Sequence, residues 1–473
     1  MVTLLGAALR LYKLGTPALW YDEALTLHYA RMPVGDLLTQ LGLTEVNTPF
    51  YYLLLKVWTV MGDSEFLLRL PSALAGIACI PVIYAIGRRL GDARVGLLAA
   101  LFLALSSIHI RYSQEVRPYS IMALAAGVAL WGLARLLMGK GGLATWSAYV
   151  VGTSVALHCH NTMVLLPLLA NLVALAWWLG PGHSDRRFPV RWVAANALTL
   201  AIWSPVLALA VRQATTVLQN TWMVSANVGQ VTGTVSETFM PTTGGRGITL
   251  LVVGLALYGV WSWRRRPVAL LATASFALGV PLLSFLISYW RPILLSRTIL
   301  WPTLPFFVLL AAGCLAVRPR ILAMAVVLVL VGNQSGPIAD YFRQQRSEPW
   351  DKVARHVADG LEPGDLILIH PWKARIAFDH YFETEAIPHT TFGIRLDIPH
   401  GREQEESVKT LADLPALATA HRRIWLVLRN SAALHGDEVR RELGSHSTEA
   451  AAWSARQLQV IKFEGRVPAA SSE

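Results

Sequence analysis

Charged residues are scarce in this chain, and their scarcity excludes most soluble folds. Asp, Glu, Lys and Arg make up 15% of its 473 residues, whereas soluble domains usually carry about 25%. Hydrophobic residues make up 54% of the chain, which excludes a disordered or collagen-like protein. We therefore interpret the chain as an integral membrane protein.

Cysteine is rarer still, and the sequence lacks the common nucleotide and metal motifs. Cys79, Cys159 and Cys314 are the only cysteines, and they lie in or beside apolar runs. Three separate cysteines exclude a disulfide framework and a CxxC metal pair, so we expect them to be small core residues. The chain contains no Walker loop, no GxGxxG and no HExxH motif. Nucleotide-driven chemistry in the cytoplasm is therefore unsupported.

Acidic residues are nearly absent from the first two thirds of the chain. Residues 1–337 contain 24 basic and 10 acidic residues, a balance of +14, whereas residues 338–473 contain 17 and 20, a balance of −3. Long apolar runs fill the first part and are absent from the second. We predict a polytopic α-helical membrane domain over 1–337 and a soluble α/β domain over 338–473.

The apolar runs predict about eleven transmembrane helices, since a spanning helix needs about 20 mainly apolar residues. The candidate spans are 2–14, 66–87, 95–110, 118–138, 144–159, 161–179, 192–211, 248–262, 268–289, 298–317 and 321–337. Every second connection is short and basic: 88–94, 135–140, 186–191, 264–266 and 318–320. The positive-inside rule then predicts a multi-pass protein of the inner (plasma) membrane, with a cytoplasmic N-terminus and an extracytoplasmic C-terminal domain. The basic excess is explained by this topology and by lipid phosphate, so no nucleic-acid partner is expected.

Two further regions have predictable secondary structure. The outer loop 15–65 contains helical patterns at 22–31, 34–42 and 49–61, which we expect to lie in the membrane interface. In the C-terminal part, a helix is expected to begin near Glu348 and another to cover 439–443. Continuous apolar strands at 366–369 and 423–428 predict a small parallel or mixed sheet.

Asp22 and Glu23 form the most informative acidic pair, because they follow the first predicted span directly. Asp22 is a candidate general base, and Glu23 beside it is a second catalytic candidate. The alternative is that Asp22 only caps a helix, because its carboxylate can accept backbone N–H bonds.

A second cluster joins two predicted spans at the same outer surface. It contains Tyr112, Gln114, Glu115, Arg117 and Tyr119. These residues could bind a sugar, and Arg117 could bind a phosphate. They could equally form a solvated ion pair between Glu115 and Arg117, flanked by tyrosines that anchor the interface.

The remaining candidates are histidines and arginines on the same side. His158, His160 and Asn161 could bind donor or acceptor sugar; a metal is poorly supported, because i and i+2 residues point to different faces of a helix. Arg69, Arg291 and Arg297 lie away from the basic face, and a guanidinium matches a lipid phosphate bidentately. The alternatives are helix-end packing for the histidines and snorkelling for the arginines.

Several motifs resemble glycosyltransferase family 39 and its bacterial mannosyltransferase-like relatives, which are GT-C membrane enzymes. They are Leu19-Trp-Tyr-Asp-Glu-Ala24, Asn47-Thr-Pro-Phe-Tyr-Tyr52, Leu68-Arg-Leu-Pro-Ser-Ala73, Arg88-Arg-Leu90 and Tyr112-Ser-Gln-Glu-Val-Arg-Pro-Tyr119. The resemblance is close over residues 10–175 and looser afterwards. Many members have Arg-Tyr where this chain has Arg297-Thr298.

The resemblance implies transfer of a sugar from a polyprenyl-phosphate carrier to an acceptor outside the cytoplasm, with inversion at C1. Asp22 would act as general base, and Arg117 and Arg297 would stabilise the leaving phosphate. No cofactor or metal is expected, and the acceptor, whether glycan, lipid or protein, stays open.

Three other functions fit parts of the sequence. A transporter or flippase of lipid-linked sugars would share the anion site, but such proteins often have inverted repeats and broken midplane helices, which are not evident here. A non-catalytic scaffold would leave Asp22 and Glu23 unexplained. An oligosaccharide ligase, which moves a glycan en bloc, is hardly separable by sequence from an enzyme that transfers one sugar.

Overall fold

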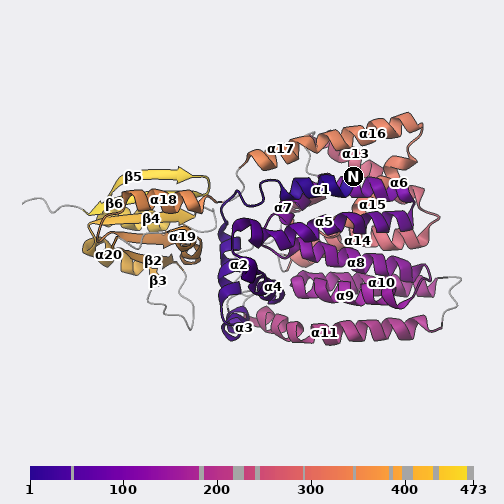
Figure 1. The fold of residues 1–473 in the computed structure, drawn as a ribbon, viewed down its shortest axis with the longest axis horizontal. Helices are drawn as coiled ribbons and strands as arrows, with labels where there is room; N and C mark the ends of the chain where they lie inside the picture. Colours follow the sequence, from indigo (N-terminus) through magenta and orange to yellow (C-terminus); the bar gives the residue numbers. More distant parts are fainter. Residues whose placement is uncertain are drawn as a thin grey trace, which may run out of the picture. The chain divides into compact units, whose positions relative to one another are not determined.

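The computed structural model describes residues 1–43, 47–180, 186–216, 228–239, 245–290, 293–344, 348–382, 387–396, 408–429 and 436–465. These residues form two compact units (Figure 1). The helical unit comprises Met1–Gly15 and Met32–Gln345, and the α/β unit comprises Thr16–Arg31 and Arg346–Glu473. The structure therefore differs from the predicted division at residue 338 in one important respect: the segment 16–31 belongs to the same unit as the C-terminal part of the chain.

The helical unit has a helix at each of the eleven predicted spans. Its main helices are α1 (Val2–Leu11), α3 (Val34–Leu43), α4 (Phe50–Trp58), α5 (Glu65–Leu90), α6 (Ala93–Leu105), α7 (Ser107–Ser113), α8 (Tyr119–Leu137), α9 (Leu143–Cys159), α10 (Leu165–Leu179), α11 (Phe188–Thr216), α12 (Val228–Phe239), α13 (Gly245–Ser262), α14 (Pro267–Ser288), α15 (Thr303–Ala316), α16 (Arg320–Asn333) and α17 (Ser335–Arg343).

Fewer of these helices are long enough to cross a bilayer than the eleven predicted. Within the described residues, seven helices qualify by length and apolar composition, or eight if the bent pair α6 and α7 counts as one span. The helices α1, α9 and α15 are shorter, with 10, 17 and 14 residues. The predicted class, a polytopic helical membrane protein with a C-terminal α/β domain, is confirmed.

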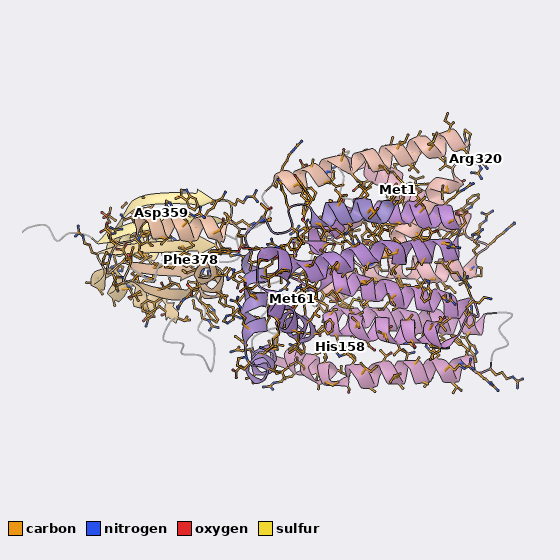
Figure 2. All side chains as sticks on the ribbon, viewed as in Figure 1. Met1, Met61, His158, Arg320, Asp359 and Phe378 are labelled. Atoms are coloured by element: carbon orange, nitrogen blue, oxygen red, sulfur yellow. The ribbon has the colours of Figure 1, made fainter. Side chains whose placement is uncertain are left out.

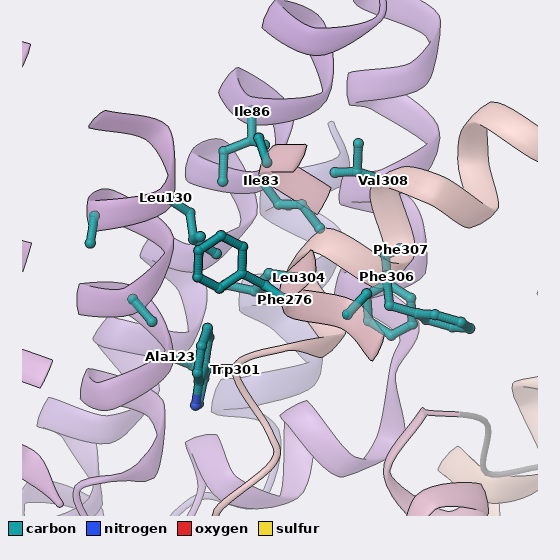
Figure 3. Close-up of a cluster of buried hydrophobic side chains, with 14 of the residues drawn as sticks. Ile83, Ile86, Ala123, Leu130, Phe276, Trp301, Leu304, Phe306, Phe307 and Val308 are labelled. Atoms are coloured by element: carbon teal, nitrogen blue, oxygen red, sulfur yellow. The ribbon is translucent and has the colours of Figure 1, made fainter. Parts of the chain in front are cut away.

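The core of the helical unit is apolar and closely packed. Phe276 from α14 and Trp301 are fully buried, with ring centroids 6.1 Å apart, among side chains of α5, α8 and α15 (Figure 3). Close helix contact depends on glycine at one crossing, where a Cβ on Gly313 of α15 would collide with the carbonyl oxygen of Leu255 in α13. All three cysteines are buried and free, as predicted.

A buried arginine stabilises the break between α6 and α7, which are bent by 63°. The guanidinium of Arg10 in α1 donates to the carbonyl oxygens of Leu103 and Ala104, at 3.1 and 3.2 Å. These carbonyls belong to the last turn of α6, where the break removes their helical partners. The break directs α7 toward Gly76 of α5, where a Cβ would collide with the hydroxyl of Ser113. This geometry sets the course of the segment that follows α7.

The α/β unit is built on a six-stranded mixed sheet in the order β3-β2-β1-β4-β6-β5. β1, β2, β3 and β4 are parallel, and β6 is antiparallel to β4 and β5. The strands are β1 (Leu366–His370), β2 (Thr390–Arg395), β3 (Val408–Thr410), β4 (Arg423–Arg429), β5 (Ser447–Ala455) and β6 (Leu458–Gly465). The predicted strands at 366–369 and 423–428 are thus neighbours at the centre of the sheet.

Helices cover the sheet because β1 and β4 carry apolar residues on both faces. Leu366 and Leu368 of β1 pack with buried side chains of α20 (Leu414–Ala420) and α21 (Gly436–His446). The alternate residues of β1 point to the opposite face, because side chains alternate along a strand. The unit also contains α2 (Tyr21–Arg31), α18 (Trp350–Gly360) and α19 (Arg375–Tyr381). Of these, α19 packs against both α18 and α2.

Candidate functional site

Arg117 lies in the short segment between α7 and α8. Its carbonyl oxygen accepts a hydrogen bond from the hydroxyl of Ser72 in α5, at 2.9 Å, and the Tyr51 hydroxyl lies 3.1 Å from the same Ser72 oxygen. Pro118 is the N-cap residue of α8. The main chain at Arg117 is therefore held by α4 and α5. The guanidinium donates to the Tyr119 hydroxyl at 3.2 Å and lies over the Tyr119 ring.

Arg297 lies in the segment between α14 and α15, which is fixed by hydroxyl groups. The Ser288 hydroxyl accepts the N–H groups of Ile293 and Leu294, at 3.0 and 2.9 Å. The Thr298 hydroxyl donates to the carbonyl oxygen of Ile293 at 2.7 Å. The fully buried Trp301 follows and anchors the chain. Threonine at 298, the position where family members often carry tyrosine, thus has a defined role in shaping this turn.

Four side chains from two other segments of the helical unit, 112–119 and 297, gather with His160, which lies between α9 and the span 161–179. The five residues are Tyr112, Arg117, Tyr119, His160 and Arg297, here named the tyrosine–arginine cluster. The Tyr112 and Tyr119 rings are 5.2 Å apart, and the Tyr119 and His160 rings are 6.3 Å apart. The cluster adjoins the end of the unit marked by His158, opposite the basic connection at Arg320 (Figure 2).

His160 is held as a neutral hydrogen-bond donor. Its Nδ1 accepts the N–H of Thr162 at 3.2 Å, so in the neutral ring the proton is assigned to Nε2. Burial lowers the pKa of His160 to about 3, and the positive charges of Arg297 and Arg117 act in the same direction. The cluster therefore offers two guanidinium groups and neutral donors, with no carboxylate among its five members.

The guanidinium of Arg297 is the least satisfied of these groups. It is partly buried, yet it makes no hydrogen bond or ion pair with any residue that the structure describes. A partly buried cation near a second guanidinium is costly unless an anion accompanies it. An arginine fork matches phosphate oxygens well. The cluster is thus suited to bind a phosphate group at the end of the helical unit.

Other predicted site residues have structural partners instead. The amide of Gln114 donates to the carbonyl oxygens of Arg10 and Tyr12, both at 2.8 Å, beyond the end of α1. Arg69 donates to the carbonyl oxygen of Leu14 at 3.0 Å. Glu115 pairs with Arg111, four residues earlier, at 3.2 Å. These contacts link the end of α1 to α5 and to the segment after α7, and Glu115 also acts electrostatically on Tyr112 of the cluster.

His158, His160 and Asn161, near the end of α9, have different contacts. His158 Nδ1 lies 2.8 Å from the carbonyl oxygen of Ser154, a contact within the helix. Asn161 donates to the side-chain oxygen of Gln213 in α11 at 3.2 Å. His160 of this motif adjoins Arg117 and Arg297. Arg291 lies outside the described residues.

Asp22 and Glu23 lie on α2, in the α/β unit, and differ sharply from each other. Glu23 is buried, and its Oε2 accepts the Trp20 N–H at 3.2 Å, which is the carboxylate half of a capping box. The carboxylate of Asp22 makes no hydrogen bond or ion pair with any residue in the described part of the chain, and it is partly exposed. The helix-cap interpretation therefore fits Glu23, while Asp22 keeps both carboxylate oxygens available.

Among the described residues, no group of three or more His, Cys, Asp or Glu side chains could hold a metal ion. The predicted site residues thus offer a cationic phosphate site and the partly exposed carboxylate of Asp22.

Sequence reasoning missed the residues that hold the site in place. Ser72 and Tyr51 support Arg117. Sequence reasoning also missed a separate ion-pair network, in which Arg111 pairs with both Glu115 and Glu237, the latter at 3.6 Å. Tyr51 and Ser72 lie inside motifs that carry the family resemblance, which was the available signal. Nothing in the sequence near Glu237 indicated a contact with Arg111, because the two residues are 126 positions apart.

The resemblance to GT-C glycosyltransferases is confirmed by comparison with known proteins. Residues 47–209 match the family model described as dolichyl-phosphate-mannose-protein mannosyltransferase. This match covers α4 to most of α11, including Arg117 and His160. Among curated protein sequences, no match to this chain is found.

Solved structures match nearly the whole chain and have the GT-C fold. ArnT from Cupriavidus metallidurans in the apo state superposes with a TM-score of 0.66 at 16% identity, over 98% of this chain and 97% of that one. The same protein bound to undecaprenyl phosphate gives 0.60 at 15% identity, over 98% and 97%. The Archaeoglobus fulgidus oligosaccharyltransferase in complex with Zn and sulfate gives 0.55 at 12% identity, over 98% and 73%. The chain is therefore a membrane protein with the GT-C fold.

Proposed function

We propose that this protein is a membrane glycosyltransferase that transfers a sugar from a polyprenyl-phosphate carrier to an acceptor on the extracytoplasmic face. The observation that carries the proposal is the tyrosine–arginine cluster, in which Arg297 lacks a partner among the described residues. A lipid-linked phosphate supplies the missing anion. The fold supports this choice, because ArnT, with a similar fold, has been solved with undecaprenyl phosphate bound.

The reaction needs no nucleotide, because the phosphate of the carrier is already a leaving group. The acceptor hydroxyl oxygen forms a bond to C1 of the sugar, while the bond between C1 and the phosphate oxygen breaks. The bonding electrons leave with that oxygen, and Arg117 and Arg297 stabilise the resulting charge. Attack from the side opposite the phosphate inverts the anomeric centre.

Asp22 is proposed as the general base that takes the proton of the acceptor hydroxyl. A base must be ionised and must have a lone pair available, and the Asp22 carboxylate satisfies the second condition because no described residue engages it. Glu23 is an unsuitable base, since it is buried and accepts a main-chain N–H.

The orientation in the inner membrane is proposed from the basic connections. Arg88, Arg135, Arg264 and Arg320 mark one end of the helical unit as cytoplasmic. The cluster adjoins the other end, so the donor phosphate would lie on the extracytoplasmic side. This matches an acceptor that is part of the cell envelope.

Mass spectrometry of lipid-linked sugars and envelope glycans, with and without the gene, tests the proposal. Loss of the gene should cause one polyprenyl-phosphate sugar to accumulate and one envelope modification to disappear. Accumulation of a lipid-linked oligosaccharide would instead indicate a ligase that moves a glycan en bloc. Loss of the same modification, with the lipid-linked sugar trapped on the cytoplasmic leaflet, would indicate a flippase, whereas an unchanged glycan with no accumulating lipid-linked sugar would contradict the proposal.

A further inference from the structure

The N-terminal end of α2 is held by side chains from the C-terminal part of the chain. The N–H of Tyr21 donates to Glu348 Oε2 at 3.1 Å, and the N–H of Leu19 donates to the Tyr381 hydroxyl at 2.7 Å. Both contacts lie within the α/β unit. They hold the main chain at Leu19 and Tyr21, immediately before Asp22.

Glu348 is a strongly engaged carboxylate. It is 6% exposed and accepts three donors: the Tyr21 N–H, Trp350 Nε1 at 2.8 Å and Arg429 Nε at 2.6 Å. Arg429 also lies over the Tyr21 ring, with 4.5 Å from its guanidinium carbon to the ring centroid. Charged hydrogen bonds in a shielded place are short and directional, so they fix the position of Tyr21 closely. Glu348, Arg429 and Tyr381 are named here the α2 clamp.

Arg429 of the clamp, and Lys373, lie at the edge where α/β sheets usually bind ligands. Arg429 is the last residue of β4, and Lys373, which follows β1, donates to the Tyr29 hydroxyl at 3.3 Å. β2 and β3 lie on one side of β1 and β4 on the other, so the strand order reverses between β1 and β4. In α/β sheets, ligands commonly bind at the carboxyl ends of the strands, at the point where the strand order reverses. In this protein, residues at that edge contact α2 of the same chain.

We propose that the C-terminal α/β domain is a positioning device for Asp22, and that Glu348, Arg429 and Tyr381 are its positioning residues. The inference rests on the proposed function, in which Asp22 is the general base. A base displaced by about 1 Å can cost 10²-fold in rate. The clamp acts on Leu19 and Tyr21 and does not contact the reacting atoms. Its loss therefore lowers kcat and leaves the affinity for the lipid-linked donor unchanged.

The test compares Glu348→Gln and Tyr381→Phe with the wild-type full-length protein in detergent. Glu348→Gln keeps the side-chain shape but removes the charge that pairs with Arg429. The matched control is Glu449→Gln, which removes a carboxylate paired with Arg440 at 2.8 Å elsewhere in the same unit, away from α2. Each protein is measured for kcat and donor KM with a synthetic polyprenyl-phosphate sugar, for unfolding temperature, and for hydrogen–deuterium exchange of residues 19–26.

Glu348→Gln is expected to lower kcat by about 10–100-fold with donor KM within twofold, and to speed exchange at the start of α2. Tyr381→Phe should show the same pattern with a smaller loss, and it keeps the proposal testable if Glu348→Gln does not fold. Glu449→Gln should leave kcat and exchange in α2 unchanged. If the clamp only stabilised the fold, Glu348→Gln would lower the unfolding temperature but would not lower kcat selectively with an unchanged donor KM.

Two results would overturn the inference in distinguishable ways. Faster exchange at residues 19–26 with an unchanged kcat would show that the clamp orders α2 without serving catalysis. A wild-type protein that releases no polyprenyl phosphate from any donor would instead remove the proposed function, and the positioning role with it.

Discussion

Replacing Arg297 by alanine should weaken donor binding without destabilising the protein. The guanidinium has no acceptor among the described residues, so its removal breaks no hydrogen bond or ion pair in that part of the chain. One charged hydrogen bond to a donor phosphate is worth about 1.5–3 kcal/mol, which corresponds to a loss of roughly 10–150-fold in affinity. Arg297→Lys should restore only part of it, because a point charge lacks the planar fork.

Arg111 provides the matched control, because it is another arginine near the cluster but is paired. It bonds Glu115 at 3.2 Å and Glu237 at 3.6 Å. Arg111→Ala should therefore lower stability by about 0.5–1 kcal/mol and leave phosphate binding nearly unchanged. The assay is binding of undecaprenyl phosphate by isothermal titration, with a thermal unfolding curve for each variant. Normal binding by Arg297→Ala, or a clear loss of its stability, would refute the reasoning.

Three further predictions concern pH, a helix cap and topology. The lowered pKa of His160, about 3 against roughly 6.5 unfolded, means that its contribution to stability is present above pH 6.5 and falls with pH toward 3. The loss is at most about 1.4 kcal/mol per pH unit, and His160→Gln should flatten this decline in unfolding curves from pH 4 to 7. The Asp413 carboxylate accepts the Thr410 N–H at 2.7 Å, which lowers its pKa, so the contribution of this cap is present above about pH 4 and is lost as the pH falls below that. Asp413→Ala should cost about 1 kcal/mol, seen as faster amide exchange in α20 at pH 7. A reporter enzyme fused after Glu473 should be active only outside the cytoplasm, and activity inside would invert the proposed orientation.

The sequence was sufficient to predict those features that depend on local pattern. Apolar runs located helices at all eleven expected spans, and the continuous apolar segments 366–369 and 423–428 are adjacent central strands. Tyr112, Arg117, Tyr119, His160 and Arg297 were all among the predicted or motif-bearing residues. These residues could be expected to lie near one another because the alternation of basic and non-basic connections placed them all on one side of the membrane. Connections on the same side lie at a common depth.

Contacts between distant segments could not be predicted. The break between α6 and α7 contains no proline or glycine, and its freed carbonyls are bonded by Arg10, more than 90 positions earlier. From the sequence, Gln114 was predicted to bind a sugar, whereas in the structure its amide caps the end of α1. The sequence around a glutamine does not distinguish these two roles. The assignment of α2 to the α/β unit depends on main-chain N–H groups of Leu19 and Tyr21, which carry no side-chain pattern.

The most direct test of the account is transfer by Asp22→Asn. Asparagine keeps the size of the side chain, and the Asp22 carboxylate caps no helix among the described residues, so the variant should fold and melt like the wild type. As a base, however, Asp22 is worth about 10²–10⁴-fold in rate. The measurement is release of polyprenyl phosphate from a synthetic lipid-linked sugar by purified protein, with donor binding followed in parallel. We expect a folded variant that binds the donor and transfers almost nothing, whereas near-normal turnover would contradict the central claim.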